Sequence, residues 1–87
     1  MRAVIHELKT WPQPFQAILG GTKRHEVRKW DRDFQPGDLV KLREWDPEKQ
    51  DYTGRSKTFS IGYCTMPGTF GLPDDIGCFT ILWWWPV

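Results

Sequence analysis

Long hydrophobic runs, closely spaced cysteines and a large net charge are all missing from this sequence. No stretch approaches the roughly 18 apolar residues of a membrane-spanning helix, and the opening MRAVIHELK carries no apolar segment typical of a signal peptide. We therefore expect a cytoplasmic protein that has no membrane partner. With a formal net charge of +1, the chain also lacks the overall basic excess of a nonspecific nucleic-acid binder.

Cysteine is scarce, with Cys64 and Cys78 as the two examples, and the histidines His6 and His25 lie far from both along the chain. Zinc sites usually contain ligand pairs separated by only a few residues. We therefore predict no metal and no cofactor. A disulfide is not expected in a reducing compartment, so both thiols are predicted to be buried on strands.

With 87 residues, the chain has room for one small domain, residues 1–87, and for no large internal cavity. Its basic residues are all confined to residues 1–57 and are concentrated in GGTKRHEVRKWDRDF, residues 20–34. This distribution predicts a local basic surface. The alternative is a solvated charged face that binds nothing.

A short helix is predicted in TWPQPFQAILGG, residues 10–21. Thr10 and Gln13 have the spacing of a capping box, and two prolines fall in the first turn, where no intrahelical hydrogen bond is lost. One of the two glycines at the end is expected to adopt the left-handed conformation that terminates helices. An apolar stripe with helical spacing is predicted to face the core: Trp11, Phe15, Ile18 and Leu19.

The rest of the chain predicts strands separated by polar or Gly/Pro-containing turns, including a hairpin connection over residues 46–55. The segments expected to form strands are 2–9, 25–30, 39–46, 56–66 and 76–85. So many strands in a short chain indicate a small closed or nearly closed β-barrel, because closure removes exposed edges. The predicted fold class is therefore α+β or mainly β, with one N-terminal helix that plugs a barrel of about five to six strands.

Several motifs resemble, in order and spacing, those of a domain-of-unknown-function family of short bacterial and phage proteins within the ASCH group of the PUA-like superfamily. The resemblance covers about the first 55 residues, and only FGL at 70–72 matches beyond them. The matching motifs are HELK at 6–9, WP at 11–12, G-x-K-x-x-E-x-R at 21–28, DRDF at 31–34, PGD at 36–38, REWDP at 43–47 and YTGR at 52–55.

The resemblance implies a PUA-like barrel with a cleft between the helix and the barrel, one wall of which is formed by the G-x-K-x-x-E-x-R segment. It also implies that the partner is RNA, a modified base or a nucleotide-like small molecule. We therefore expect a binding module.

The residues of this segment fit such a ligand. Lys23 offers a mobile ammonium to a phosphate or a carbonyl oxygen. Glu26 and Arg28 share one face of the predicted strand, where Glu26 could accept hydrogen bonds from an amine and Arg28 could grip a phosphate with two donors. Trp30 continues that face as a stacking surface. The alternative is a surface ion pair between Glu26 and Arg28, worth about 0.5 kcal/mol.

Three further arginines complete the set of candidate ligand-binding residues: Arg32, Arg43 and Arg55. Glu44 and Asp46 lie on the inward face of the predicted strand 39–46, and a carboxylate that faces the barrel mouth needs a partner. Arg28, Arg32 or Arg55 could supply it. Alternatively, Asp46 only starts the turn that follows.

The resemblance also leaves an enzyme open. Some ASCH proteins resemble amidohydrolases of acylated cytidine that use the lysine of the G-x-K segment, and Lys23 and Arg28 match that lysine and the arginine after it. Lys23 and Glu26 are candidate catalytic residues in this case only. Glu26 stands where the hydrolases carry a threonine, and their later catalytic glutamate has no clear counterpart. A ribonuclease with a Lys/His/Glu set that includes His25 is a related alternative.

The C-terminal Trp83, Trp84 and Trp85 point alternately to the two sides of the expected last strand. At least one of them is expected in the core, and the others could form a surface for self-association, because exposed tryptophan favours burial against a partner. We therefore predict a possible homodimer through this strand. A protein–protein adaptor that uses the same tryptophans is the remaining alternative.

Overall fold

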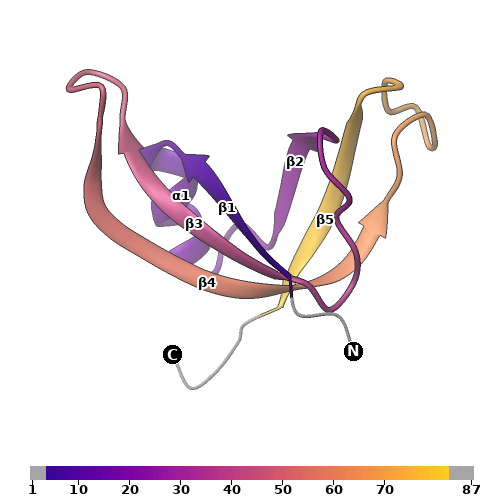
Figure 1. Ribbon diagram of the computed structural model, residues 1–87, viewed down its shortest axis with the longest axis horizontal. Helices are drawn as coiled ribbons and strands as arrows, with labels where there is room; N and C mark the ends of the chain where they lie inside the picture. Colours follow the sequence, from indigo (N-terminus) through magenta and orange to yellow (C-terminus); the bar gives the residue numbers. More distant parts are fainter. Residues whose placement is uncertain (1–3, 83–87) are drawn as a thin grey trace.

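The computed structural model describes residues 4–82, in which one short helix is combined with five strands (Figure 1). The elements are β1 (Ile5–Thr10), α1 (Pro12–Leu19), β2 (His25–Lys29), β3 (Leu39–Asp46), β4 (Asp51–Thr65) and β5 (Ile76–Leu82). The predicted fold class is confirmed: the protein is mainly β, and one N-terminal helix accompanies a five-stranded mixed sheet that curls into a half-barrel.

The sheet has the strand order β1-β3-β4-β5-β2. β1 pairs with β3 in parallel, whereas the other three pairings are antiparallel. The long strand β4 bends around the molecule and carries the curl (Figure 1). In the part of the chain that the structure describes, no backbone ladder joins β1 to β2, so the barrel stays open between these two edge strands. We call this gap the seam.

Alternation of residue type explains why the strands form and which face they bury. Along β1, His6, Leu8 and Thr10 are buried, whereas the residues between them are exposed. The same alternation buries Val40, Leu42 and Glu44 of β3, on the face that the sequence predicted to point inward. The inward faces of the sheet and the helix share one apolar core: Leu8, Phe15, Ile18, Phe34, Val40, Leu42, Phe59, Ile61, Phe79 and Ile81.

The helix starts at Pro12, and Trp11 is its N-cap residue without a side-chain cap. The predicted capping box at Thr10 is therefore wrong, because Thr10 still belongs to β1. Phe15 and Ile18 face the core as predicted, but Trp11 does not, since its side chain is 54% exposed. Gly21 has a φ of 82° and supplies the expected left-handed residue after the helix.

Strand β4 begins at Asp51, earlier than expected, so the residues predicted as a hairpin connection partly belong to the sheet. Tyr52 is paired with Trp45, and a β-bulge lies between Arg43 and Trp45. The predicted strand 76–85 is observed as far as Leu82. Trp83–Trp85 lie outside the described residues, and the prediction of a homodimer through them stays a prediction.

A buried hydrogen-bond centre at Asp38 fixes the turn that leads into β3. The Asp38 carboxylate is 2.8 Å from His6 Nε2 and accepts a hydrogen bond from the Gln35 backbone N–H at 3.1 Å. The backbone carbonyl of Asp38 accepts a further hydrogen bond from the backbone N–H of Ile61 in β4. His6 is therefore a structural hydrogen-bonding residue, and it ties β1 to this turn.

The two cysteines lie on neighbouring strands as free thiols. Both are half-buried rather than fully buried as predicted, and this partial burial raises the pKa of each thiol. None of the helical structure within residues 4–82 has the length and apolar character that a membrane crossing requires.

Candidate functional site

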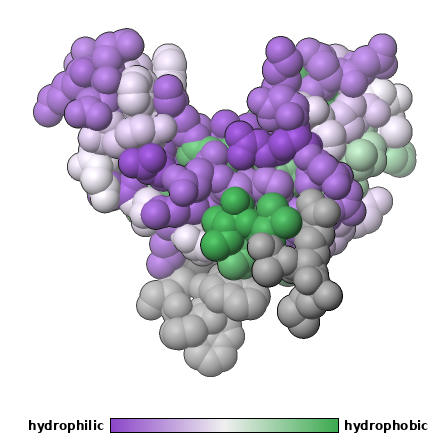
Figure 2. All heavy atoms as spheres, in the orientation of Figure 1, coloured by the Kyte–Doolittle hydropathy of each residue, from purple (hydrophilic) through white to green (hydrophobic). Residues whose placement is uncertain are grey.

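The seam contains a groove with a volume of about 340 Å³, which we call the seam groove. Its lining comes from β1, β2, the segment after β2 and the start of β4: Glu7, Leu8, Lys9, Arg28, Lys29, Asp31, Arg32, Phe34 and Tyr52. The space-filling view shows the molecule hollowed between two lobes, with largely hydrophilic side chains around the hollow (Figure 2). The groove is thus an open surface feature that a ligand could reach from solvent.

The groove is basic. Its lining includes four cationic side chains and two carboxylates. The cations come from three segments, with Lys9 on β1, Arg28 and Lys29 on β2, and Arg32 beyond the end of β2. The excess of cations gives the groove a local positive charge even though the whole chain is almost neutral.

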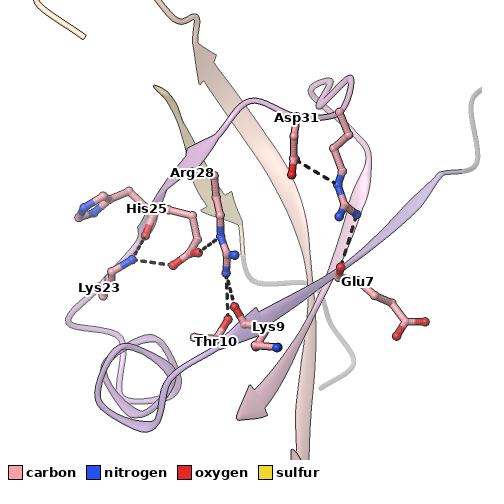
Figure 3. A network of polar contacts seen from close by, with 9 residues as sticks. Glu7, Lys9, Thr10, Lys23, His25, Arg28 and Asp31 are labelled. Atoms are coloured by element: carbon pink, nitrogen blue, oxygen red, sulfur yellow. Dashed lines mark hydrogen bonds and ion pairs between the residues drawn. The ribbon is translucent and has the colours of Figure 1, made fainter. Parts of the chain in front are cut away.

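Arg28 crosses the seam from β2 to β1 (Figure 3). Its Nη2 donates to the Lys9 carbonyl oxygen at 2.7 Å and to Thr10 Oγ1 at 3.2 Å, and its Nε donates to Glu26 Oε2 at 2.8 Å. Arg32 makes a second, longer crossing to the Glu7 carbonyl oxygen at 3.4 Å. Two guanidinium groups therefore donate hydrogen bonds to backbone carbonyls on the open edge of β1. In a closed barrel, the backbone N–H groups of a neighbouring strand would take this place.

Glu26 holds Arg28 in place through the bond to its Nε atom. Its side chain is almost fully buried, and its second oxygen accepts a hydrogen bond from Lys23 Nζ at 2.7 Å. Lys23 also donates to the backbone oxygen of His25 at 2.6 Å. A buried carboxylate needs such paired donors. We call Thr10, Lys23, Glu26 and Arg28 the seam cluster.

The seam cluster brings together three residues that the sequence predicts as ligand-binding, namely Lys23, Glu26 and Arg28. Arg28 lines the groove, whereas Lys23 and Glu26 are not part of its lining. Arg32, also predicted, does line the groove. The spacing of G-x-K-x-x-E-x-R thus places three residues in one hydrogen-bonded cluster, and Arg28 is the member that lines the groove. Their role in ligand binding stays a prediction.

Trp30 follows β2 and is half-buried, with its ring packed in an edge-to-face arrangement on Phe34 at a centroid distance of 4.8 Å. The indole also lies so close to Gly77 that a Cβ there would be 2.3 Å from the ring. Most of this ring is thus used in packing. Its predicted role as a stacking surface stays a prediction, with less free ring area than the sequence suggested.

The structure places Arg43 and Arg55 away from the seam cluster. Arg43 lies on the outer face of β3, 3.7 Å from the Glu7 carboxylate and with its guanidinium 3.8 Å from the centre of the Tyr52 ring. Arg55 points toward the helix end of the half-barrel, where it pairs with Glu44. Neither side chain lines the seam groove.

Glu44, Thr53 and Arg55 form a second polar group, which we call the hairpin cluster. The Arg55 Nε and Nη2 atoms donate to the two oxygens of Glu44, each at 2.9 Å, and Thr53 Oγ1 donates to Glu44 at 2.6 Å. The bonds from Arg55, and then that from Thr53, lower the pKa of Glu44 to about 2. Of the partners that the sequence offered for this buried carboxylate, the structure selects Arg55.

Several residues of the groove were missed by reasoning from the sequence: Glu7, Lys9, Lys29, Asp31 and Tyr52. Glu7 and Lys9 are on the exposed face of β1. Their place in a groove, however, depends on β1 lying opposite β2, which no local pattern contains. Within residues 4–82, no group of three or more His, Cys, Asp or Glu side chains is arranged to hold a metal ion.

Together, the half-barrel and the basic groove between its edge strands define a small β-module with an open groove at its seam. A family model described as "Domain of unknown function (DUF3850)" matches residues 5–81, and the chain belongs to this family. The predicted membership of a domain-of-unknown-function family is thus confirmed, and the match extends well beyond the first part of the chain.

The chain is also similar to the "Uncharacterized 12.9 kDa protein in GpA 3'region" of Escherichia phage P2, with 47% identity over 45 residues. This similarity covers 52% of the chain and 41% of the phage protein, so the matched region spans less than half of that relative. The expected relationship to phage proteins is therefore confirmed at the level of sequence.

Proposed function

We propose that this protein is a cytoplasmic binding module of the ASCH group of PUA-like β-barrels, and that it binds RNA or a nucleotide-like ligand in the seam groove. The observation that carries this proposal is the convergence of Lys9, Arg28, Lys29 and Arg32 on one open groove in an almost neutral chain. Phosphate contacts of this kind supply affinity that is independent of base sequence and sensitive to salt.

The contacts of these cations give them different roles in binding. Arg28 is held by Glu26 and by two acceptors on β1, so its position is largely fixed before a ligand arrives. Lys29 is exposed and can adjust to a phosphate. The carboxylates of Glu7 and Asp31 provide acceptors for the amines or hydroxyl groups of a base or a sugar.

The proposal is tested by titrating fluorescein-labelled oligouridylate, with UMP and CMP as competitors, into the wild-type protein and a Lys29→Ala/Arg32→Ala variant. A matched control, Arg24→Ala/Lys49→Ala, removes one arginine and one lysine that are exposed and lie outside the groove. We expect the groove variant to bind at least about tenfold more weakly. The slope of log K against log salt should fall by about 1.4, which is about 0.7 for each phosphate that the variant no longer neutralises.

The control variant should retain the affinity and nearly the full salt slope of the wild type. Absence of binding by the wild type to all three probes would contradict the proposal. Equal losses in the groove variant and the control would also contradict it, because general charge rather than the groove would then explain the binding.

An amidohydrolase or a ribonuclease is the second candidate, and one contact favours it: the Lys23 ammonium lies 2.7 Å from a buried carboxylate, as in many lysine-dependent sites. Two of the three Lys23 donors are, however, already used by Glu26 and the His25 carbonyl. Incubation with N4-acetylcytidine or RNA, followed by NMR, would detect product. Product that forms with the wild type and is lost in Lys23→Ala would establish catalysis.

A protein–protein adaptor or a homodimer through Trp83–Trp85 depends on residues outside the described part of the chain. Light scattering after size exclusion would test self-association. A monomeric mass for the wild type would contradict the dimer, whereas a dimer that is lost in Trp83→Ser/Trp85→Ser would support it.

A further inference from the structure

We propose that Trp45 and Tyr52 form a base-stacking subsite beside the seam groove, so that the ligand is a single-stranded nucleic acid of several nucleotides rather than a mononucleotide. This inference rests on the function proposed above and names the ligand class of the same site. Three features support it: the arrangement of the two rings, their continuity with the groove, and the cations that lie over the ring faces.

Trp45 and Tyr52 face each other across the paired strands β3 and β4. Their ring centroids lie 5.0 Å apart with an interplanar angle of 79°, an edge-to-face pair. Each ring also carries a cation on its face. Lys9 Nζ lies 3.8 Å from the centre of the Trp45 ring, and the Arg43 guanidinium carbon lies 3.8 Å from that of Tyr52. The result is a continuous arrangement of two aromatic rings and two cations, which we call the aromatic ladder.

The aromatic ladder shares two of its four residues with the seam groove, because Lys9 and Tyr52 also belong to the lining of the groove. A ligand in the groove therefore already contacts two members of the ladder. Glu7 connects the two regions as well, since it lines the groove and lies 3.7 Å from Arg43. The surface available to a ligand is thus longer than the groove alone.

The composition of the aromatic ladder matches what single-stranded nucleic acid needs. Bases stack on aromatic rings and on arginine guanidinium planes, and phosphates bind the adjacent cations. Cation–π contacts at exposed sites are weak. A base could therefore take the ring face that Lys9 now covers, while the released ammonium binds the phosphate of the same nucleotide. In a duplex the base faces are already stacked, so this exchange selects single strands.

The test compares the affinities of UMP, the dinucleotide UpU and an oligouridylate of about eight nucleotides, with the deoxythymidine series and a blunt hairpin duplex as further arms. The variant is Tyr52→Leu. The matched control is Tyr63→Leu, which removes a tyrosine of the same strand that is 67% exposed and does not line the groove.

We expect the wild type to bind the longest single strand at least about tenfold more tightly than UMP, and more tightly than the duplex. Tyr52→Leu should lose about tenfold for the long strand and less than about twofold for UMP. Tyr63→Leu should match the wild type, and Tyr52→Phe should restore the affinity, because it keeps the ring. If Tyr52→Leu does not fold, the indole N–H signal of Trp45, assigned with Trp45→Phe, still decides: it should shift with the long strand and not with UMP.

Three results would overturn the subsite. One is an affinity that does not depend on ligand length in the wild type while UMP still binds in the groove, which leaves the proposed function standing. The second is an equal loss for UMP and the long strand in Tyr52→Leu, which assigns Tyr52 to the groove alone. The third is a Trp45 signal that does not move. Failure of the wild type to bind any probe, by contrast, would refute the groove itself.

Discussion

The seam cluster and the hairpin cluster contain the same kinds of residue in different surroundings. Each has a buried carboxylate that is bonded to an arginine, with a threonine hydroxyl in the same hydrogen-bond network. In the hairpin cluster, the strands that carry these residues, β3 and β4, are also joined by a backbone ladder. In the seam cluster, the edges of β1 and β2 are joined through side chains.

The difference shows that the same kind of ion pair can have two structural roles. In the hairpin cluster the Glu44–Arg55 pair is added to a connection that already exists, and half of the Arg55 side chain remains exposed. In the seam cluster, Arg28 and Arg32 form hydrogen bonds across the gap, and they also line the groove. Under the proposed function, an anion in the groove would meet the same two guanidinium groups that donate to the carbonyl acceptors of β1. Ligand binding and the closure of the half-barrel should be coupled at the seam and independent at the hairpin.

The largest effect is expected from Arg28→Ala. This change removes the crossing to Lys9 and Thr10 and leaves the buried Glu26 with Lys23 as its remaining partner. The free energy of unfolding should fall by about 2 kcal/mol. Urea unfolding measures the loss, and hydrogen exchange should show that β1 opens more readily than β3.

Arg24→Ala is the control for this prediction, because Arg24 is an exposed arginine of the same segment whose described contact is a long 3.3 Å bond to the Gly21 carbonyl. It should change stability by less than about 0.5 kcal/mol. Arg55→Ala should destabilise less than Arg28→Ala, because the backbone ladder remains. An equal or larger effect at Arg55 would show that the seam does not depend on its arginines.

The contribution of the hairpin cluster should instead be visible in the pH dependence of stability. The pKa of Glu44 is about 2 in the folded protein and near the ordinary 4.5 in the unfolded chain. The unfolded chain therefore binds this proton first as the pH falls. The stability contributed by Glu44 is fully present above about pH 4.5 and is lost as the pH falls toward about 2. The urea midpoints of the wild type and Glu44→Gln should thus converge as the pH falls from about 4.5 to about 2.

Glu48→Gln supplies the reference for the pH series, since Glu48 is an exposed glutamate in the adjacent turn. Its urea midpoint should follow that of the wild type over the whole range. A constant difference between the wild type and Glu44→Gln at all pH values would mean that Glu44 is not titrating in this window.

The contrast between the clusters also explains which features the sequence could predict. Alternation in HELKT and LVKLREW predicted the strands and the inward face of β3, and the apolar spacing predicted that Phe15 and Ile18 face the core. The strand order could not be predicted, because the parallel pairing of β1 with β3 joins residues far apart in the chain. The open seam follows from that strand order, so it could not be predicted either. The sequence therefore predicted a closed or nearly closed barrel.

The same limit applies to the candidate site. Glu26 and Arg28 share one face of β2, and Lys23 lies in the turn just before this strand, so their association was predictable from local geometry. The contact of Arg28 with Thr10 was not predictable, since it needs β1 and β2 to meet. Arg43 is turned to the outer face of β3, next to a bulge that the pattern of residues did not indicate.

The smallest effects on stability should come from the two threonines, and these effects test the difference between the two clusters most directly. Thr53→Val removes the 2.6 Å donor to a carboxylate and leaves Glu44 with Arg55, which should cost about 1 kcal/mol in urea unfolding. Thr10→Val removes one 3.2 Å acceptor of Arg28, which keeps the Lys9 carbonyl, so the cost should be about 0.5 kcal/mol. In the Arg28→Ala background Thr10→Val should become neutral, whereas Thr53→Val should keep its full effect. A cost of Thr10→Val that persists without Arg28 would show that the hydroxyl acts within β1 alone and that the seam cluster is not a coupled unit.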